Sequence, residues 1–151
     1  MGYRRILVPV DGSATSARGV AEAIKLAQDA RAKLLLLHVV EEYAILGIPE
    51  AGASIGPVLD ALKRAGRATL AKIERSACRL GARPETMLIE DFSGRVANAV
   101  VDQAKRWRAD LIVMGTHGRR GLDRMFLGSD AELVARHSPV PVLLVPPRGR
   151  K

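Results

Sequence analysis

Short apolar runs lie along the chain, and each has the length of a buried β-strand. Their residues are apolar at consecutive positions, which is typical of parallel strands covered by helices on both faces. The first run ends at Val10 and is followed by Asp11, Gly12 and Ser13, which favour a tight turn. The predicted strands cover residues 5–10, 33–40, 86–89, 111–114 and 141–145.

Amphipathic segments separate these runs, because apolar residues there recur every three or four positions. Pro57 suits a first helical turn, Ser129 and Glu132 have capping-box spacing, and Trp107 falls on an apolar helical face that favours core packing. Residues 41–56 are rich in glycine and proline and predict a long loop. We expect helices from about Ser16 to Ala27, from Pro57 to Leu80, from Val96 to Trp107 and from Ser129 to Ser138.

Strands and helices alternate along the whole chain, which predicts an α/β fold with a doubly wound parallel sheet and right-handed crossovers. With 151 residues, of which 48% are apolar, we expect a single domain over residues 1–147 and a basic tail over 148–151. Ligands of such sheets bind outside the carboxyl ends of the strands, where the strand order reverses. If the first and fourth strands are neighbours, the loops after Val10 and Met114 face each other there.

Composition limits which cellular compartment and which classes of partner we expect. No apolar run approaches the roughly 20 residues that cross a bilayer, and the first residues lack the pattern of a secretory signal, so we expect a cytoplasmic protein without membrane contact. The single cysteine, Cys78, excludes an internal disulfide, and its neighbours favour a small buried side chain over a reactive thiol. The net charge of +8 suits nucleic acid or a small polyphosphate, but scattered basic residues and 3% aromatic residues make nucleic acid the weaker hypothesis.

Glycines mark the loop after the fourth strand. Gly115 and Gly118 are suited to bring backbone N–H groups close to phosphate oxygens, since a Cβ would occupy that space. Gly128 and Ser129 open a helix, whose N–H groups and positive dipole end form an anion site. We expect both segments to bind one polyphosphate, although the chain has neither the phosphate-loop nor the dinucleotide fingerprint.

The spacing Gly115-x-x-Gly118, nine residues, then Gly128-Ser129 resembles the ATP-binding signature of the universal stress protein family. Residues 8–13, 37–39 and 139–142 are also similar to family landmarks, so the resemblance covers essentially the whole chain. It implies a five-stranded sheet in the order 3-2-1-4-5, a homodimer paired through the last strand, and an ATP-binding regulatory role in stress tolerance.

The resemblance also implies which residues surround ATP. Asp11, with Pro9 and Val10 beside it, resembles the aspartate next to the nucleoside, and Val39 the residue whose backbone lies near adenine. Asp130 departs from the small apolar residue common in the family, and we expect it to turn outward. The candidate site residues are Pro9, Val10, Asp11, Gly12, Ser13, Val39, Met114, Gly115, His117, Gly118, Arg119, Gly128, Ser129 and Asp130.

Three functions remain open: an ATP-binding regulator, a slow ATPase or nucleotidyl transferase on the same fold, and a basic nucleic-acid-associated protein. His117 has no carboxylate partner nearby in sequence, which favours a residue lining the site over a general base. Arg119 either neutralises phosphates or is solvated. His38 and His137 give no metal-ligand spacing with His117, so magnesium would arrive with ATP, held mainly by phosphates and water.

Overall fold

The computed structural model describes residues 2–46, 55–117 and 127–148. Its strands form one parallel sheet in the order β3-β2-β1-β4-β5, which confirms the predicted α/β class and the strand order that the resemblance implied. The predicted strands and helices are all present, with boundaries shifted by a few residues. The elements are β1 (Arg5–Pro9), α1 (Ala14–Ala30), β2 (Lys33–Glu41), α2 (Tyr43–Leu46), α3 (Ile55–Arg79), β3 (Glu85–Asp91), α4 (Val96–Trp107), β4 (Leu111–Gly115), α5 (Ser129–His137) and β5 (Val142–Val145).

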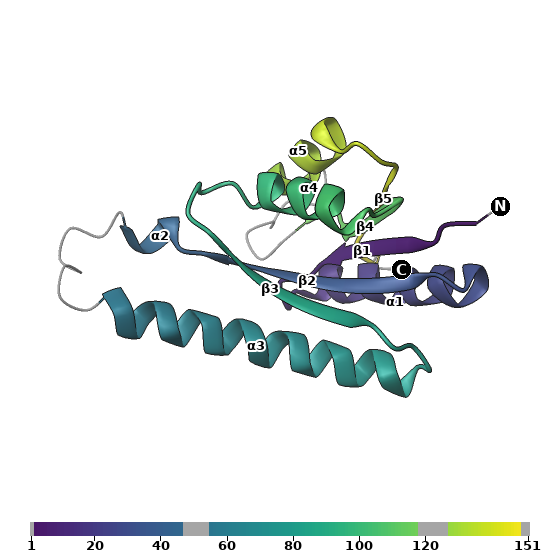
Figure 1. The fold of residues 1–151 in the computed structure, drawn as a ribbon, viewed down its shortest axis with the longest axis horizontal. Coiled ribbons are helices and arrows are strands. Elements are labelled where there is room, and N and C mark those ends of the chain that lie inside the picture. The colour runs from purple at the N-terminus through teal and green to yellow at the C-terminus, as the bar shows by residue number, and fades with distance from the viewer. Residues whose placement is uncertain (1, 47–54, 118–126, 149–151) are drawn as a thin grey trace.

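Two helical layers cover the sheet, with α1 and α3 on one face and α4 and α5 on the other (Figure 1). Successive strand residues point to opposite faces, so each strand contributes to both cores. In β1, Ile6 and Val8 pack with α1 and α3, while Leu7 packs with α4 and α5. This double burial explains why the strands read as continuous apolar runs rather than as alternating patterns.

The central strand β1 lies between β2 and β4, with Leu7 opposite Leu35 on one side and Ile112 on the other. The chain leaves β1 toward β2 and β3, and then returns to β4 and β5 on the other side. The strand order therefore reverses between β1 and β4. β1 and β4 are neighbours, which is the condition under which we predicted a crevice between the loops after Val10 and Met114.

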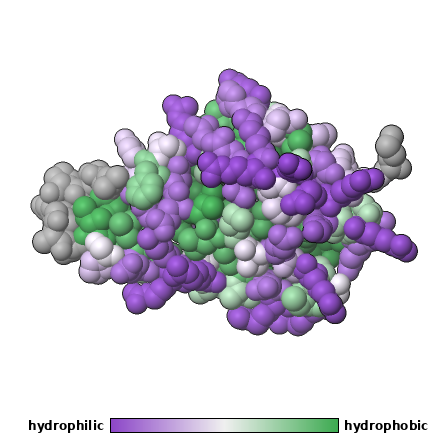
Figure 2. All heavy atoms as spheres, viewed as in Figure 1, coloured by the Kyte–Doolittle hydropathy of each residue, from purple (hydrophilic) through white to green (hydrophobic). Residues whose placement is uncertain are grey.

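The segment after β2 differs from the predicted loop. β2 continues to Glu41, which pairs in register with Asp91 of β3, and the backbone N–H of Glu42 donates to the carbonyl of Asp91 at 3.0 Å. The short helix α2 follows, and the buried Ile45 anchors it. Pairing with β3 thus extends regular structure into the first residues of the predicted loop, which contain no glycine. Residues 47–54 of that loop lie outside the described residues. Around α2 the surface is partly apolar (Figure 2), with Tyr43 and Phe92 each 60% exposed.

The two side chains singled out on predicted helix faces have different outcomes. Trp107 is buried as predicted, with its indole N–H donating to Glu85 at 3.3 Å and the guanidinium of Arg5 4.3 Å above its ring. Cys78, predicted to be buried, is exposed. Its neighbour Ala77 faces the core instead, and one residue along a helix rotates the side chain by about 100° toward solvent.

In the described part of the chain, no helix combines the length and the apolar character that a bilayer crossing requires.

Candidate functional site

The turn between β1 and α1 is fixed by its own side chains. Gly12 adopts a φ of 80°, a conformation that other residues rarely tolerate. The Oδ1 atom of Asp11 accepts a hydrogen bond from the N–H of Ser13 at 2.8 Å, and Ser13 Oγ caps α1 by accepting from the N–H of Ser16 at 3.1 Å. This turn therefore holds the Asp11 carboxylate at the carboxyl end of β1. The predicted tight turn is present, and the predicted contact of Asp11 with the nucleoside stays a prediction.

His38 is a positioning residue that the sequence interpretation did not include in the site. Its ring is buried, and its Nδ1 lies 2.8 Å from the carbonyl oxygen of Val10, so Nδ1 must carry the proton and donate. The N–H of Val10 donates to Leu37 at 2.8 Å, which pairs both polar backbone groups of Val10 with β2. The sequence offers one hint of this arrangement, which is the glycine at position 66 within a predicted helix. In the structure, a Cβ at Gly66 would lie only 2.7 Å from Cδ2 of His38, so the glycine leaves room for the ring.

The structure adds a packing reason for the glycine at Gly115, whose approach to phosphate oxygens stays a prediction. Among the described residues, the glycines with positive φ are Gly12, Gly81 and Gly94, so Gly115 does not need the left-handed conformation expected for a phosphate loop. Instead, a Cβ at Gly115 would lie 2.8 Å from Cγ2 and 2.9 Å from the backbone carbon and oxygen of Thr15. The glycine thus permits the first turn of α1 to pack directly against the end of β4.

The segment before α5 returns to the end of β4. Thr116 donates its N–H to Val145 of β5 at 3.0 Å, and its carbonyl accepts the N–H of Gly128 at 2.8 Å. The tertiary fold therefore brings Gly128 beside the residue that follows Gly115. Gly118 and Arg119, the two remaining residues predicted for this loop, lie outside the described residues.

The capping role predicted for Ser129 is wrong. Gly128 is the N-cap of α5, and its carbonyl accepts the N–H of Glu132 at 2.9 Å, which makes Ser129 the first helical residue. The hydrogen bond to Thr116 places Gly128 at this position, one residue earlier than the capping-box spacing suggested. Ser129 and Asp130 are both exposed, and the N–H groups ahead of Glu132 have no intrahelical acceptor.

His117 directly follows Thr116 at the end of β4. Its Nδ1 is 2.8 Å from the hydroxyl oxygen of Thr116, while its buried Nε2 has no hydrogen-bond partner among the residues that the structure describes. A buried polar nitrogen left unpaired costs free energy, so a partner at Nε2 would stabilise the loop. The remaining candidates differ in exposure: Met114 is buried in the core that faces α4 and α5, whereas Pro9 and Val39 are half-buried.

A second polar cluster lies where β2 and β3 end, and nothing in the sequence interpretation identified it. Glu42 is only 1% exposed, and its carboxyl approaches that of Glu90. Lys63 reaches from α3 to both, with its Nζ 2.8 Å from Glu90 Oε1 and 3.8 Å from Glu42 Oε1. The longer distance does not satisfy Glu42, whose Oε1 has no hydrogen-bond partner.

The pKa values in this cluster are shifted in different directions: those of Glu42 and Lys63 are raised and that of Glu90 is lowered. Burial raises the pKa of Glu42 above its ordinary value of 4.5, and the hydrogen bond with Glu90 and its negative charge raise it further, against the opposing charge of Lys63. The hydrogen bond from Lys63 is the main cause that lowers the pKa of Glu90 and raises the pKa of Lys63. Glu42 is therefore the carboxyl that retains the shared proton, which it donates to Glu90.

We expect Glu42→Gln to raise the melting temperature by a few degrees at mildly alkaline pH. A folded-state pKa above the unfolded one means that the contribution of Glu42 is present below pH 4.5 and is lost as the pH rises through the raised value. Glutamine keeps an N–H donor toward Glu90 without a charge to bury. Thermal unfolding followed by circular dichroism across this range should show a gain that grows with pH.

The control is Asp29→Asn, which neutralises an exposed carboxylate on α1, away from the cluster. It should leave the pH dependence of the melting temperature as in the wild type. A Glu42→Gln protein that loses stability as the pH rises would contradict the assigned proton.

Within the described ranges, no three histidine, cysteine, aspartate or glutamate side chains gather in a way that could hold a metal ion.

Known proteins similar to this chain share one family. The family model described as the universal stress protein family matches residues 2–146. A universal stress protein of Methanocaldococcus jannaschii is 37% identical over 143 residues, which cover 95% of this chain and 82% of the relative. A solved universal stress protein of Lactobacillus plantarum is 27% identical, with a TM-score of 0.84 and coverage of 96% and 99%. A solved universal stress protein in complex with cAMP is also 27% identical, with a TM-score of 0.72 and coverage of 98% and 100%.

Proposed function

The chain belongs to the universal stress protein family, and from this premise we propose that it binds ATP and acts as a nucleotide-dependent regulator of the stress response in the cytoplasm. The proposed site lies outside the carboxyl ends of β1 and β4. One relative of known structure, 27% identical to this chain, holds the adenine nucleotide cAMP. That complex supports an adenine nucleotide as the ligand class.

The observation that carries the proposal is the hydrogen bond from the N–H of Gly128 to the carbonyl of Thr116 at 2.8 Å. It holds the N-terminus of α5 beside the end of β4. The Thr15 backbone packs against Gly115 from the other side, so the first turn of α1 reaches the same place. Two helix N-termini, each with a positive dipole end, thus approach one edge of the sheet, which favours an anionic ligand.

In this proposal the phosphates bind at α5. The first-turn N–H groups and the exposed Ser129 hydroxyl would donate to phosphate oxygens, and His117 Nε2 would gain the partner that it lacks. Gly118 and Arg119 would complete the phosphate site. Magnesium would be held by the phosphates and water, without dedicated protein ligands.

The nucleoside would lie over the end of β1. The Asp11 carboxylate, fixed by the N–H of Ser13, suits ribose hydroxyls, because these are hydrogen-bond donors. His38 donates to the carbonyl of Val10, and adenine would be recognised by the backbone near Val39. This division assigns Asp11 a ligand-binding role in addition to its role in the turn.

Native mass spectrometry of freshly purified protein tests the proposal first, and calorimetric titration of nucleotide-free protein with ATP, ADP, AMP and cAMP tests it second. We expect saturable binding in the micromolar range for at least ATP, strengthened by magnesium. A chain that carries no nucleotide and gives no saturable titration with any of the four would refute the proposal.

We further propose that two copies pair through β5. This strand is an edge of the sheet, and its sequence Val-Leu-Leu-Val has no charge, whereas the opposite edge strand β3 contains Glu85, Glu90 and Asp91. Charged side chains discourage edge pairing, so β5 is the edge open to a second copy. Leu143 is 37% exposed there and would be covered.

Leu143→Glu is expected to convert the dimer to a monomer, because a two-fold axis would bring the two introduced carboxylates close together. Sedimentation velocity measures the change. Leu62→Glu is the matched control, since Leu62 is 38% exposed on α3, away from β5. A wild-type chain that is monomeric at high concentration, or a Leu143→Glu chain that remains dimeric, would contradict this assignment.

A further inference from the structure

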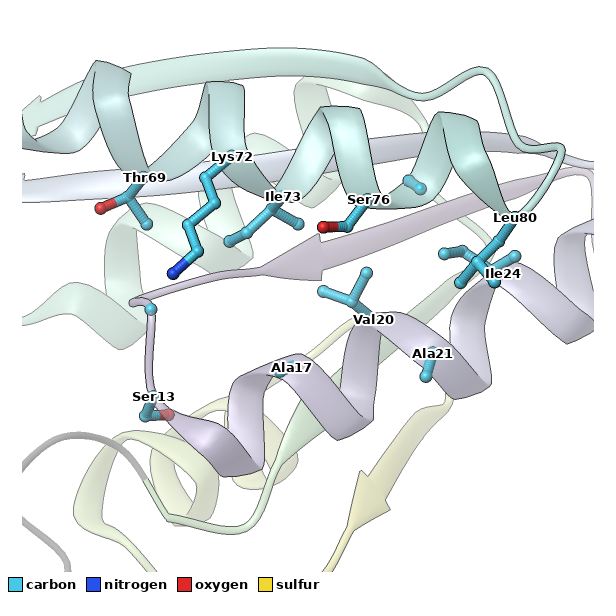
Figure 3. Close-up of a pocket in the computed structure, with 12 residues that line it drawn as sticks. Ser13, Ala17, Val20, Ala21, Ile24, Thr69, Lys72, Ile73, Ser76 and Leu80 are labelled. Carbon is cyan, nitrogen blue, oxygen red and sulfur yellow. The ribbon is translucent and has the colours of Figure 1, made fainter.

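A groove of about 360 Å³ lies between α1 and α3, apart from the proposed phosphate site. Its walls are mainly apolar and include Val20 and Ile24 from α1 and Ile73 and Ala77 from α3. Figure 3 shows Val20 of α1 and Ile73 of α3 facing one another across the space between the two helices. Small-molecule sites in proteins have this size and lining, with a few polar groups that set the orientation of the ligand.

The polar groups gather at one end of the groove. Lys72 extends from α3 toward the end of the groove where Ser13 lies, while Ile24 and Leu80 lie at the other end (Figure 3). Lys72 is exposed, and none of the ion pairs among the described residues includes it. The positive dipole end of α1 lies at this same end, because Ser13 is the N-cap of the helix.

This arrangement selects an elongated ligand with one negative end. From Ser13 to Ile24 the groove follows α1 for about 17 Å at the helical rise of 1.5 Å per residue. A single cation at one end matches a single anion, and the apolar remainder matches a hydrocarbon chain. A polyphosphate does not fit, since its charges would lie along the apolar walls.

We propose that the groove binds a free medium-chain fatty acid, with its carboxylate at Lys72 and its acyl chain between α1 and α3. The groove shares the turn at Gly12 and Ser13 with the proposed nucleotide site, whereas Lys72 and the apolar walls belong to the groove alone. It does not depend on whether ATP binds.

Decanoate is the test ligand, with decanol as its uncharged counterpart. Titration of the full-length protein below the micellar concentration is expected to show saturable binding of decanoate, and weaker binding of decanol. In methyl NMR spectra, decanoate should shift the resonances of Val20, Ile24 and Ile73. The absence of saturable decanoate binding would overturn the proposal.

Two variants locate the ligand. Lys72→Met should weaken decanoate about three- to tenfold while leaving decanol unchanged, because only the carboxylate loses a partner. Lys105→Met, a matched change of an exposed lysine on α4, should leave both affinities unchanged. Equal losses in the two lysine variants would show that general charge attraction, and not the groove, holds the ligand.

Ala21→Trp should abolish binding of both ligands, since Ala21 lines the groove and indole would fill it. Ala135→Trp, on the exposed surface of α5, is its control and should bind as the wild type does. Retained decanoate binding in a folded Ala21→Trp protein would overturn the proposal. Binding to anionic vesicles but not to decanoate would overturn it as well.

Discussion

Gly128→Val is expected to abolish ATP binding while the chain still folds. Gly128 has a φ of −59° and a ψ of 147°, which valine adopts without strain, and the valine N–H can still donate to Thr116. The isopropyl group, however, would stand over the first turn of α5, where the phosphates are proposed to bind. Loss of two or more charge-assisted hydrogen bonds predicts an affinity at least about a hundredfold weaker.

Calorimetric titration measures this loss, and circular dichroism verifies the fold, for which we expect a cost of about 1 kcal/mol at the N-cap. Gly56→Val is the matched control, because a Cβ at Gly56 meets no atom within 4 Å. It should bind ATP as the wild type does. If wild-type affinity persists in folded Gly128→Val protein, the N-terminus of α5 does not hold the phosphates.

Gly115→Ala is expected to lower the melting temperature markedly, even though it adds a single methyl group. The added Cβ would lie 2.9 Å from the backbone carbon and oxygen of Thr15, which cannot yield without a shift of α1. Overpacking of this kind costs about 1–3 kcal/mol, which corresponds to roughly 3–10 °C for a chain of this size. Displacement of α1 would also move the Asp11 turn, so ATP affinity should fall in parallel.

Thermal unfolding of two further variants separates this mechanism from a general intolerance of alanine. Gly56→Ala introduces the same methyl group into open space and should not lower the melting temperature. Thr15→Ser removes the Cγ2 atom that lies 2.8 Å from the added Cβ, and in the double variant it should restore only part of the stability. A Gly115→Ala protein as stable as the wild type would show that α1 and β4 do not approach this closely.

The local pattern predicted the fold well because the two helical layers bury the inner strands β1, β2 and β4 on both faces. The apolar run from Leu34 to Leu37 indicates a buried strand for this reason. The recurrence of Val20, Ile24 and Ala27 indicates a helix that packs on the sheet. The exceptions are positions whose burial or secondary structure depends on contacts with other residues. Cys78 turned to solvent because Ala77 took the buried position, and the residues after Glu41 formed α2 because β3 paired with β2 as far as Asp91.

For the candidate site, the sequence by itself determined the strand order through family resemblance and marked the two glycine segments that meet at the end of β4. Only the tertiary structure decided that Gly115 packs against Thr15, that His38 pairs with Val10, and that Glu42, Lys63 and Glu90 form one cluster. Periodicity and spacing act over a few residues and follow from local backbone geometry. These contacts join residues far apart in the chain, so they exist only after the sheet has brought its carboxyl ends together.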